Sequence, residues 1–377
     1  MKIIHVVENL DKGAVENWLV RTYIKSRENE PGLDWTFYCI LPEKGILEDI
    51  VIQNGGNVIH SPVLLSDKVS FLRHLRKVLK KGKYSIFHSH HDFLSGFYFF
   101  AFAGLGVQKK IIHVHNLAKS LPVGNRILHD FLIVVFRQIS LLFYDIVIGV
   151  SSDALFDFTN RKNFKKGKVV FCGIAFNEYD PKIIKDDIRK ELLVDPSTKI
   201  ILFAGRLTRD KNPAFLVEIL DGILQMNYGL NFCIVYLGEG EEGDSIKKQA
   251  SKLGLSEKIH LVGYRKDLAR FFSQSDIFIF PRFEAIKEGL GLVLVEAQAA
   301  GLPIITTEAI PKDAFVSEDL VTILNTQDSV SQWVNAVLEI TSRPRLNQTI
   351  YFNKANYSRF SLDNSTIELL DIYKSEL

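Results

Sequence analysis

Two glutamates, Glu288 and Glu296, flank a pair of glycines, Gly289 and Gly291, in the sequence EGLGLVLVE. Carboxylates accept hydrogen bonds from neighbouring hydroxyl groups. The unpaired backbone N–H groups at the start of the helix predicted over 292–300, together with its dipole, attract an anion. The glycines let a ligand approach the backbone closely. These features predict a site for a polyhydroxy ligand that carries phosphate, with two solvated glutamates as the alternative.

A second charged group follows a predicted strand, in the sequence GRLTRDKNP (205–213). Arg206 and Lys211 would clamp a diphosphate beside the start of a helix, the arginine as a fork and the lysine as a point charge. The alternative is a solvated basic loop. Another strand is followed by LGEGEEGD (237–244), where Gly238 suits a tight turn near a ligand.

Histidines gather at the ends of two further predicted strands, in HSHHD (88–92) and HVHN (113–116). We favour hydrogen bonding to sugar hydroxyls over a zinc site, because no carboxylate or cysteine partner recurs at zinc-like spacing. Histidines with a purely structural role are the remaining alternative.

The loop ENLDKGAVEN (8–17) places Gly13 just before a predicted helix, which makes a second candidate anion site. It is not a GxGxxG fingerprint, so a dinucleotide-dependent oxidoreductase is disfavoured. The sequence also lacks a P-loop, GxSxG, HExxH and any pair of aspartates two positions apart.

The composition describes an ordinary globular chain of 377 residues with net charge +2, long enough for two domains and without a general attraction to nucleic acid. Three widely spaced cysteines, Cys39, Cys172 and Cys233, fit a reducing cytoplasm. The first residues predict a strand rather than a signal peptide. Two long apolar stretches, 93–107 and 127–150, are interpreted as buried or half-buried helices and strands, with an apolar surface that touches a bilayer as the alternative.

Predicted strands and helices alternate along the chain, which indicates βαβ units and mainly parallel sheets. A break at 176–196 separates two series, so we expect an α/β protein with two doubly wound, Rossmann-like domains that face each other across a cleft, where ligands bind beyond the carboxyl ends of the strands. The predicted strands are 3–7, 35–41, 57–60, 85–90, 110–115, 145–151, 168–172, 199–205, 231–238, 258–264, 276–281, 303–307 and 320–324. The predicted helices include 17–25, 46–53, 69–80, 92–103, 125–143, 214–225, 292–300, 329–340 and 364–374.

Basic residues cluster on the helix predicted over 69–80 and just beyond it. A solvated face is the simple interpretation, and contact with an anionic membrane surface is the alternative, with ~1 kcal/mol from each basic residue. The cluster comprises Arg73, Arg76, Lys77, Lys80, Lys81 and Lys83.

The motifs together resemble the retaining glycosyltransferases of family 4, which have the GT-B fold, and in particular bacterial transferases of exopolysaccharide or capsule assembly. EGLGLVLVEAQAAGLPII is similar to the E-x(7)-E motif of this family, and GRLTRDKN to its G-R-x(4)-K-N stretch. SDIFIFP (275–281) resembles the strand before the motif loop, and the two histidine segments resemble strand ends of the family's N-terminal domain. The resemblance extends over nearly the whole chain.

The resemblance implies roles for individual residues. Glu288 would bind hydroxyls of the donor sugar, Glu296 the ribose, and Arg206 and Lys211 the diphosphate leaving group in place of a metal ion. Of His113 and His115 we favour His113 as the catalytic contact to the donor sugar, as the first polar residue after the strand. Further expected donor contacts are Gly289, Leu290, Gly291, Gly205, Gly238, Tyr264 and Gly13, and expected contacts to acceptor or sugar are His115, His90 and Asn116.

The resemblance also implies a reaction: a hexose moves from a nucleotide diphosphate sugar to a glycan or lipid-linked glycan, with the anomeric configuration retained. Family frequency favours UDP over GDP. We expect no metal, no cofactor and no nucleic acid, and a cytoplasmic protein with peripheral contact at the inner face of the membrane. The expected domains are 1–176 for the acceptor, 177–354 for the nucleotide sugar, and a C-terminal helix in 355–377 that packs back on the first. A non-catalytic GT-B partner subunit, an epimerase or a phosphorylase stay open as alternatives.

The sequence departs from the family pattern at three places. Lys12–Gly13 stands where the family often has two glycines, and Cys172–Gly173 where it has Asn-Gly. The motif loop contains an additional acidic residue, Glu284.

Overall fold

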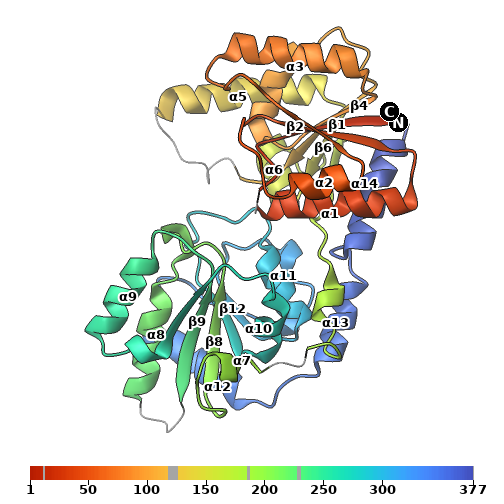
Figure 1. Ribbon diagram of the computed structural model, residues 1–377. Coiled ribbons are helices and arrows are strands. Elements are labelled where there is room, and N and C mark those ends of the chain that lie inside the picture. The colour runs from red at the N-terminus through yellow and green to blue at the C-terminus, as the bar shows by residue number, and fades with distance from the viewer. Residues whose placement is uncertain (12, 118–125, 185–186, 227–230, 377) are drawn as a thin grey trace. The chain divides into compact units, whose positions relative to one another are not determined.

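A computed structural model describes residues 1–11, 13–117, 126–184, 187–226 and 231–376 (Figure 1). The chain forms two compact units, and each is described here by itself. The first unit comprises Met1–Ile174 and Arg359–Leu377, and the second comprises Ala175–Ser358. The boundaries expected from the sequence were 176/177 and 354/355.

The first unit is built on a seven-stranded sheet in the order β3-β2-β1-β4-β5-β6-β7, with every described pairing parallel. Its central strands are nearly continuous apolar runs, because helices cover both faces of the sheet. The strands are β1 (Lys2–Val7), β2 (Asp34–Cys39), β3 (Asn57–His60), β4 (Ile86–Ser89), β5 (Lys109–Val114), β6 (Ile146–Gly149) and β7 (Gly167–Val169).

Helices lie on the two faces of this sheet, with α3 and α5 on one side and α1 and α14 on the other (Figure 1). A 3-10 helix, η1, and the short helix α4 belong to the layer of α3 and α5, where α4 contacts α3 and η1 contacts α5. The helices are α1 (Ala14–Asn29), α2 (Glu48–Gln53), α3 (Lys68–Gly82), η1 (Asp92–Tyr98), α4 (Phe99–Phe102), α5 (Arg126–Phe143), α6 (Ser152–Thr159) and α14 (Leu362–Lys374).

The C-terminal helix α14 packs along α1 and is held there by polar contacts. The indole Nε1 of Trp18 donates to the Ser365 hydroxyl at 3.1 Å. The buried ammonium of Lys109 donates to the carbonyl oxygens of Ile372 at 2.7 Å and Tyr373 at 3.1 Å. A cation at this position satisfies carbonyls that the end of a helix leaves unpaired and complements the helix dipole. The last segment of the chain therefore completes the core of the first unit.

The second unit contains a six-stranded parallel sheet in the order β10-β9-β8-β11-β12-β13. Helices α8, α9 and α12 form one group of contacts and α10, α11 and α13 another. The strands are β8 (Lys199–Ala204), β9 (Phe232–Leu237), β10 (Ile259–Gly263), β11 (Ile277–Phe280), β12 (Ile304–Thr306) and β13 (Val321–Ile323). The helices are η3 (Phe176–Tyr179), α7 (Ile188–Glu191), η4 (Arg209–Lys211), α8 (Phe215–Gln225), α9 (Gly243–Lys252), η5 (Ser256–Lys258), α10 (Leu268–Gln274), α11 (Leu292–Ala299), η6 (Lys312–Ala314), η7 (Glu318–Leu320), α12 (Val330–Ser342) and α13 (Gln348–Asn356).

The prediction of two α/β units with parallel sheets is confirmed, but one predicted helix is wrong. The segment 92–103 forms the 3-10 helix η1 followed by the short α4. Asp92 has a φ of 45°, and a side chain at Gly96 would lie 2.0 Å from the Phe136 carbonyl oxygen. The backbone of α5 therefore packs directly on this segment, and the tertiary contact overrides the helical propensity of the sequence.

The helices of the described residues are each too short or too polar to cross a bilayer. This includes the described part of the apolar stretch 127–150.

Candidate functional site

Two loops of the second unit approach each other backbone to backbone at the carboxyl ends of β8 and β9. Gly205 and Gly238 have φ values of 141° and 134°, which L side chains rarely adopt. A side chain at Gly238 would lie 2.0 Å from the Gly205 carbonyl oxygen. The Leu207 amide donates to the Glu239 carbonyl at 2.9 Å, which joins the loops further. Both glycines are therefore needed for the close contact of the loops.

Lys211 is a desolvated cation in this pair of loops, whereas Arg206 is exposed. The Lys211 ammonium lies 3.4 Å from the position that a Cβ would take at Gly205, and 5.3 Å from the ring centre of Phe280. Burial lowers the pKa of Lys211, and the carboxylate of Glu288 acts in the opposite direction. The lysine predicted from the sequence thus lies at the end of β8, close to the predicted glutamate.

A buried arginine that the sequence analysis did not select connects the two predicted loops. Arg282 is 5% exposed and follows the buried strand β11 after one residue, Pro281. Its Nη1 lies 2.6 Å from Asp210 Oδ2 and 2.9 Å from Glu288 Oε2, and its Nε donates to the Ile286 carbonyl at 2.6 Å. An arginine at the end of an apolar strand, next to Pro281, was the available signal. Arg282 fixes Glu288 relative to the loop that contains Lys211.

The predicted helix start is present at α11. Gly291 precedes this helix with a φ of 84°, and no side chain caps the helix there. Leu290 is buried, Gly289 and Glu288 are half-buried, and Glu296 is half-buried within the helix. The first turn of α11, which is half-buried at Leu292 and Val293, therefore comes shortly after the glutamate that Arg282 holds.

Two other residues of this region take different roles. Glu284 accepts hydrogen bonds from the Thr326 amide at 2.8 Å and the Thr326 hydroxyl at 2.5 Å, so this additional acidic residue secures the loop after β13. Tyr264 follows β10 and is 48% exposed. With Gly205, Gly238 and Lys211, it lies at the carboxyl edge of the parallel sheet of the second unit.

In the first unit, histidines of three neighbouring strands form one buried cluster between the sheet and helices α1 and α14. Trp18 of α1 and Tyr373 of α14 contact its rings. Nδ1 of His5 lies 3.0 Å from Nε2 of His90, and Nδ1 of His90 lies 3.0 Å from Nε2 of His115. The cluster comprises His5, His88, His90, His113 and His115, all buried. The sequence analysis missed His5, although a histidine within the apolar strand IIHVV was a signal.

The preference for His113 over His115 rested on a wrong premise. β5 extends to Val114, so His113 lies within the strand and is fully buried, and His115 is the first residue after it. Both ring nitrogens of His113 are buried, and a backbone hydrogen bond with Val170 only partly offsets the lowering of its pKa by burial. His115 is therefore better placed than His113 to contact a ligand.

Burial lowers the pKa of every histidine in the cluster, that of His113 to about 3 and the others well below the usual value. The rings are therefore neutral at physiological pH.

Two sets of side chains could hold a metal ion by distance alone. Ring nitrogens of the histidine cluster lie within 4.8 Å of one another in two groups of three, both of which include His90. Because both nitrogens of His90 already bond to neighbouring rings, the hydrogen-bonded arrangement is favoured over zinc.

A third group, Cys39, Glu48 and His60, meets at the ends of β2 and β3. Its carboxylate accepts from the Gly45 amide at 2.6 Å and pairs with His60 at 2.9 Å, so it already has partners.

Asp92 organises the loop after β5. Its carboxylate accepts hydrogen bonds from the backbone amides of His115 at 2.7 Å and Asn116 at 3.3 Å, and from the Asn116 side chain at 3.0 Å. Burial raises the pKa of Asp92 to about 6. Asn116 itself is exposed. Asp92 thereby fixes the position of both predicted ligand contacts.

The start of α1 carries its own carboxylate. Gly13 is exposed, and a Cβ there would lie 1.8 Å from Glu16 Oε2. Burial raises the pKa of Glu16, and the nearby carboxylates of Glu8 and Asp11 act in the same direction. These acidic groups oppose the phosphate contact predicted at Gly13. Lys12, which precedes it, lies outside the described residues.

Replacing Arg282 by methionine should destabilise the second unit. The change leaves the carboxylates of Asp210 and Glu288 close together without their common cation, so the free energy of unfolding should fall by about 3 kcal/mol. Urea titration measures it. Arg343→Met, which removes an exposed pair with Glu339, is the control and should cost less than about 1 kcal/mol. Equal losses in both variants would show that Arg282 does not hold the loops.

Asp92→Asn should remove a pH dependence from the first unit. Between pH 3.8 and about 6 the folded state keeps the Asp92 proton that the unfolded state has lost, so stability falls as pH rises. From pH 4 to 7 this contributes a loss of about 2 kcal/mol in the free energy of unfolding. Urea titrations at both pH values should show this loss in the wild type and not in Asp92→Asn. The exposed Asp49→Asn should behave as the wild type, and an unchanged slope in Asp92→Asn would contradict the shift.

Two family models match the chain in succession. The model described as Glycosyltransferase Family 4 matches residues 32–176, and the model described as Glycosyl transferases group 1 matches residues 184–357. The capsular polysaccharide biosynthesis glycosyltransferase CapH of Staphylococcus aureus is 23% identical over 380 residues, which cover 100% of this chain and 99% of CapH.

A second relative and a solved structure are also similar. The UDP-Gal:alpha-D-GlcNAc-diphosphoundecaprenol alpha-1,3-galactosyltransferase of Escherichia coli is 26% identical over 184 residues, 48% of this chain and 47% of that enzyme. HepE of Anabaena, solved in complex with UDP, has a TM-score of 0.79 and 17% identity over 100% of both chains. With two parallel-sheet α/β units and these matches along its length, the chain belongs to the family 4 glycosyltransferases and has the GT-B fold.

Proposed function

We propose that this chain transfers a hexose from a UDP-sugar to a glycan or lipid-linked glycan during assembly of a surface polysaccharide. The observation that carries the proposal is the desolvated Lys211 beside the Gly205–Gly238 contact, with Glu288 held near it by Arg282. HepE, with the same fold, was solved with UDP and with UDP-glucose. The similar E. coli enzyme is named for a UDP-galactose donor and a lipid-diphosphate acceptor, and CapH for capsule biosynthesis.

In this proposal the second unit binds the donor, and its charges replace a metal ion. Lys211 and Arg206 neutralise the diphosphate as negative charge develops on it in the transition state. Desolvation strengthens the contribution of Lys211, because its field is weakly screened. Gly205, Gly238, Gly289, Leu290, Gly291 and Tyr264 shape the donor site, and Glu296 accepts hydrogen bonds from the ribose.

Glu288 would orient the sugar in a same-face reaction that retains the anomeric configuration. One oxygen of its carboxylate is paired with Arg282, which leaves the group suited to accept hydrogen bonds from sugar hydroxyls. The bond between the anomeric carbon and the phosphate oxygen breaks while the acceptor oxygen bonds to that carbon on the same face. The proton of the acceptor hydroxyl moves to the leaving phosphate oxygen, so the step needs no separate base.

For the first unit we propose contacts to the acceptor and the transferred sugar. His115 and Asn116 follow β5 on a loop that Asp92 holds in place. His90 acts behind His115, and the buried His113 packs beneath it. Gly13 lies among carboxylates that suit acceptor hydroxyls better than phosphate.

Thermal shift with a panel of nucleotides and nucleotide sugars, without added metal, tests the donor site. UDP and its sugars should stabilise the protein selectively, by ~2.7 kcal/mol at 100 times the dissociation constant. Arg206→Ala and Lys211→Ala should abolish this shift and the transfer. The exposed Arg209→Ala in the same loop should keep both.

Retained binding and transfer in Arg206→Ala and Lys211→Ala would contradict the diphosphate assignment. Absence of any nucleotide shift in the wild type would favour a non-catalytic partner subunit. The anomeric configuration of the product, read from its proton NMR coupling constant, tests retention, and an inverted product would contradict the same-face reaction.

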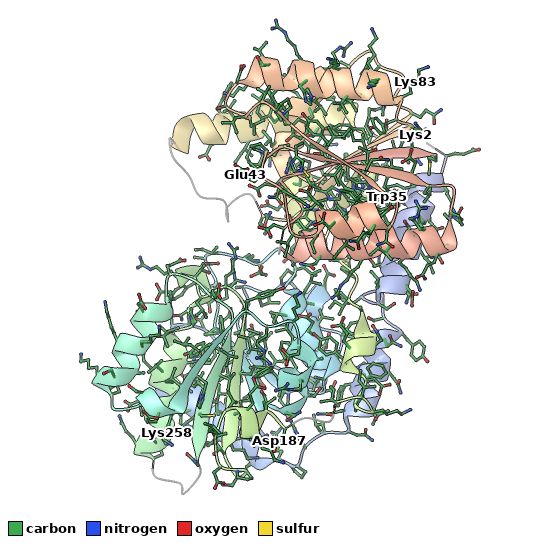
Figure 2. All side chains as sticks on the ribbon, viewed as in Figure 1. Lys2, Trp35, Glu43, Lys83, Asp187 and Lys258 are labelled. Atoms are coloured by element: carbon green, nitrogen blue, oxygen red, sulfur yellow. The ribbon has the colours of Figure 1, made fainter. Side chains whose placement is uncertain are left out.

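We also propose that the first unit touches the inner face of the membrane through α3, α4 and α5, in a cytoplasmic enzyme. Arg73, Lys77, Lys80 and Lys81 are exposed on α3, whose side chains extend outward beside the labelled Lys83 in Figure 2. Arg76 is not part of this face, because it donates to the Ala101 and Ala103 carbonyls. Exposed apolar side chains on the adjoining α4 and α5 complete an amphipathic surface: Phe100, Phe131, Val134, Leu142 and Phe143.

Co-sedimentation with vesicles rich in phosphatidylglycerol tests the membrane surface. Binding should weaken with salt and fall about 30-fold in Lys77→Ala/Lys81→Ala, since each basic residue contributes ~1 kcal/mol. Lys247→Ala, on the exposed side of α9 in the second unit, is the control and should bind as the wild type. No binding, or binding unaffected by salt, would contradict the proposal.

A further inference from the structure

Three imidazole rings of the first unit join edge to edge in one chain. Nδ1 of His5 faces Nε2 of His90, and Nδ1 of His90 faces Nε2 of His115, each at 3.0 Å. The ring centres lie 5.4 and 5.3 Å apart, with interplanar angles of 20° and 25°. Because the centres are more than 2 Å farther apart than the nitrogens, the rings meet through their edges and not through their faces. This is the geometry of true hydrogen bonds between imidazoles.

The hydrogen bonds between these three rings restrict which nitrogen of each ring carries the proton. Burial keeps all three rings neutral, so each has one N–H donor and one lone pair. Every junction joins an Nδ1 to an Nε2, and each junction needs one proton. The three rings must therefore share one tautomer: either all carry the proton on Nδ1, or all carry it on Nε2.

The two ends of the chain decide between these forms. The free ends are Nε2 of His5 and Nδ1 of His115, both buried without a hydrogen-bond partner in the described structure. His5 is fully enclosed, with its ring centre 4.1 Å from that of Trp35 (labelled in Figure 2) and 5.4 Å from that of Phe37. An N–H group on Nε2 of His5 would find no acceptor among the described residues. A buried donor without a partner destabilises the folded state. His115 directly follows β5, at the edge of a parallel sheet where ligands of such folds bind.

We propose that His5 and His90 are positioning residues that hold His115 in the Nδ1–H form, so that His115 donates a hydrogen bond to an oxygen of the transferred sugar. The role of His115 rests on the function proposed above, whereas the shared tautomer rests on the geometry of the chain. In this form the free nitrogen of His115 has no lone pair to offer, so it does not act as a base. His113 is not part of the hydrogen-bonded row formed by His5, His90 and His115. It packs against His115, with 4.5 Å between ring centres.

Nitrogen-15 NMR of the full-length, ligand-free protein labelled in its histidine rings tests the proposal directly. The long-range proton couplings of each ring distinguish Nδ1–H from Nε2–H, and single histidine variants assign the signals. His5, His90 and His115 should all be in the Nδ1–H form, the reverse of the Nε2–H form that free neutral histidine prefers. An Nε2–H form at His115, or unequal tautomers among the three rings, would overturn the proposal.

A pair of variants separates positioning from packing. His5→Asp replaces the inner donor by a carboxylate, which only accepts when ionised, so His90 should donate to it from Nε2 and His115 should shift to Nε2–H. His88→Asp makes the same change at an equally buried histidine that bonds to the Tyr373 hydroxyl outside the row of three rings, and it should leave the His115 tautomer unchanged. An unchanged His115 in His5→Asp, or the same shift in both variants, contradicts the proposal.

Steady-state kinetics of the position-5 variant test the role of His115 independently. If His115 donates in the transition state, His5→Asp should lower kcat about tenfold with little change in the donor KM, a loss of ~1.4 kcal/mol. Because the NMR experiment uses no donor, its result holds even where the protein shows no transfer. Should His5→Asp fail to fold, the tautomers of the wild type still decide.

Discussion

A parallel sheet brings the carboxyl ends of all its strands to one edge, and the candidate sites of this chain depend on that constraint. In the second unit the ends of β8, β9 and β11 supply Gly205, Gly238 and Arg282, which lie far apart in sequence. In the first unit the ends of β4 and β5 supply His90 and His115, which bond to each other. The positions of these residues follow from where the strands end, because the chain leaves a parallel sheet at that edge.

Desolvation has opposite effects in the charged loops of the second unit and in the histidine cluster of the first. The second unit keeps charges in poorly solvated positions and balances them, with Arg282 between two carboxylates and Lys211 close to Glu288. Such charges have strong local fields because water does not screen them. The histidine cluster of the first unit is buried and neutral, so its rings act through hydrogen bonds. Stabilising a diphosphate requires the first strategy, and recognising hydroxyl groups requires only the second.

Much of this arrangement was predictable from sequence, and the failures have physical causes. The two parallel-sheet units followed from the alternation of apolar runs with helical segments, whereas the close contact of Gly238 with Gly205 was not predicted. Arg282 was missed because its partner Asp210 is distant in sequence, and because no sequence pattern shows that the nearby Glu288 pairs with it. The role of Asp92 was missed because its partners, the amides of His115 and Asn116, belong to a distant part of the sequence, which local propensity does not encode.

The choice between His113 and His115 shows the same limit at finer scale. A shift of one or two residues in the end of β5 decides which histidine lies inside the strand, and boundaries are where sequence patterns are least informative. No sequence pattern indicates which ring nitrogen bears a proton, since that depends on bonds among three strands. In the proposed reaction the leaving phosphate takes the acceptor proton, so a competing base beside the sugar would be a disadvantage. If His5, His90 and His115 are all neutral and in the Nδ1–H form, His115 presents a hydrogen-bond donor to the sugar and no basic lone pair.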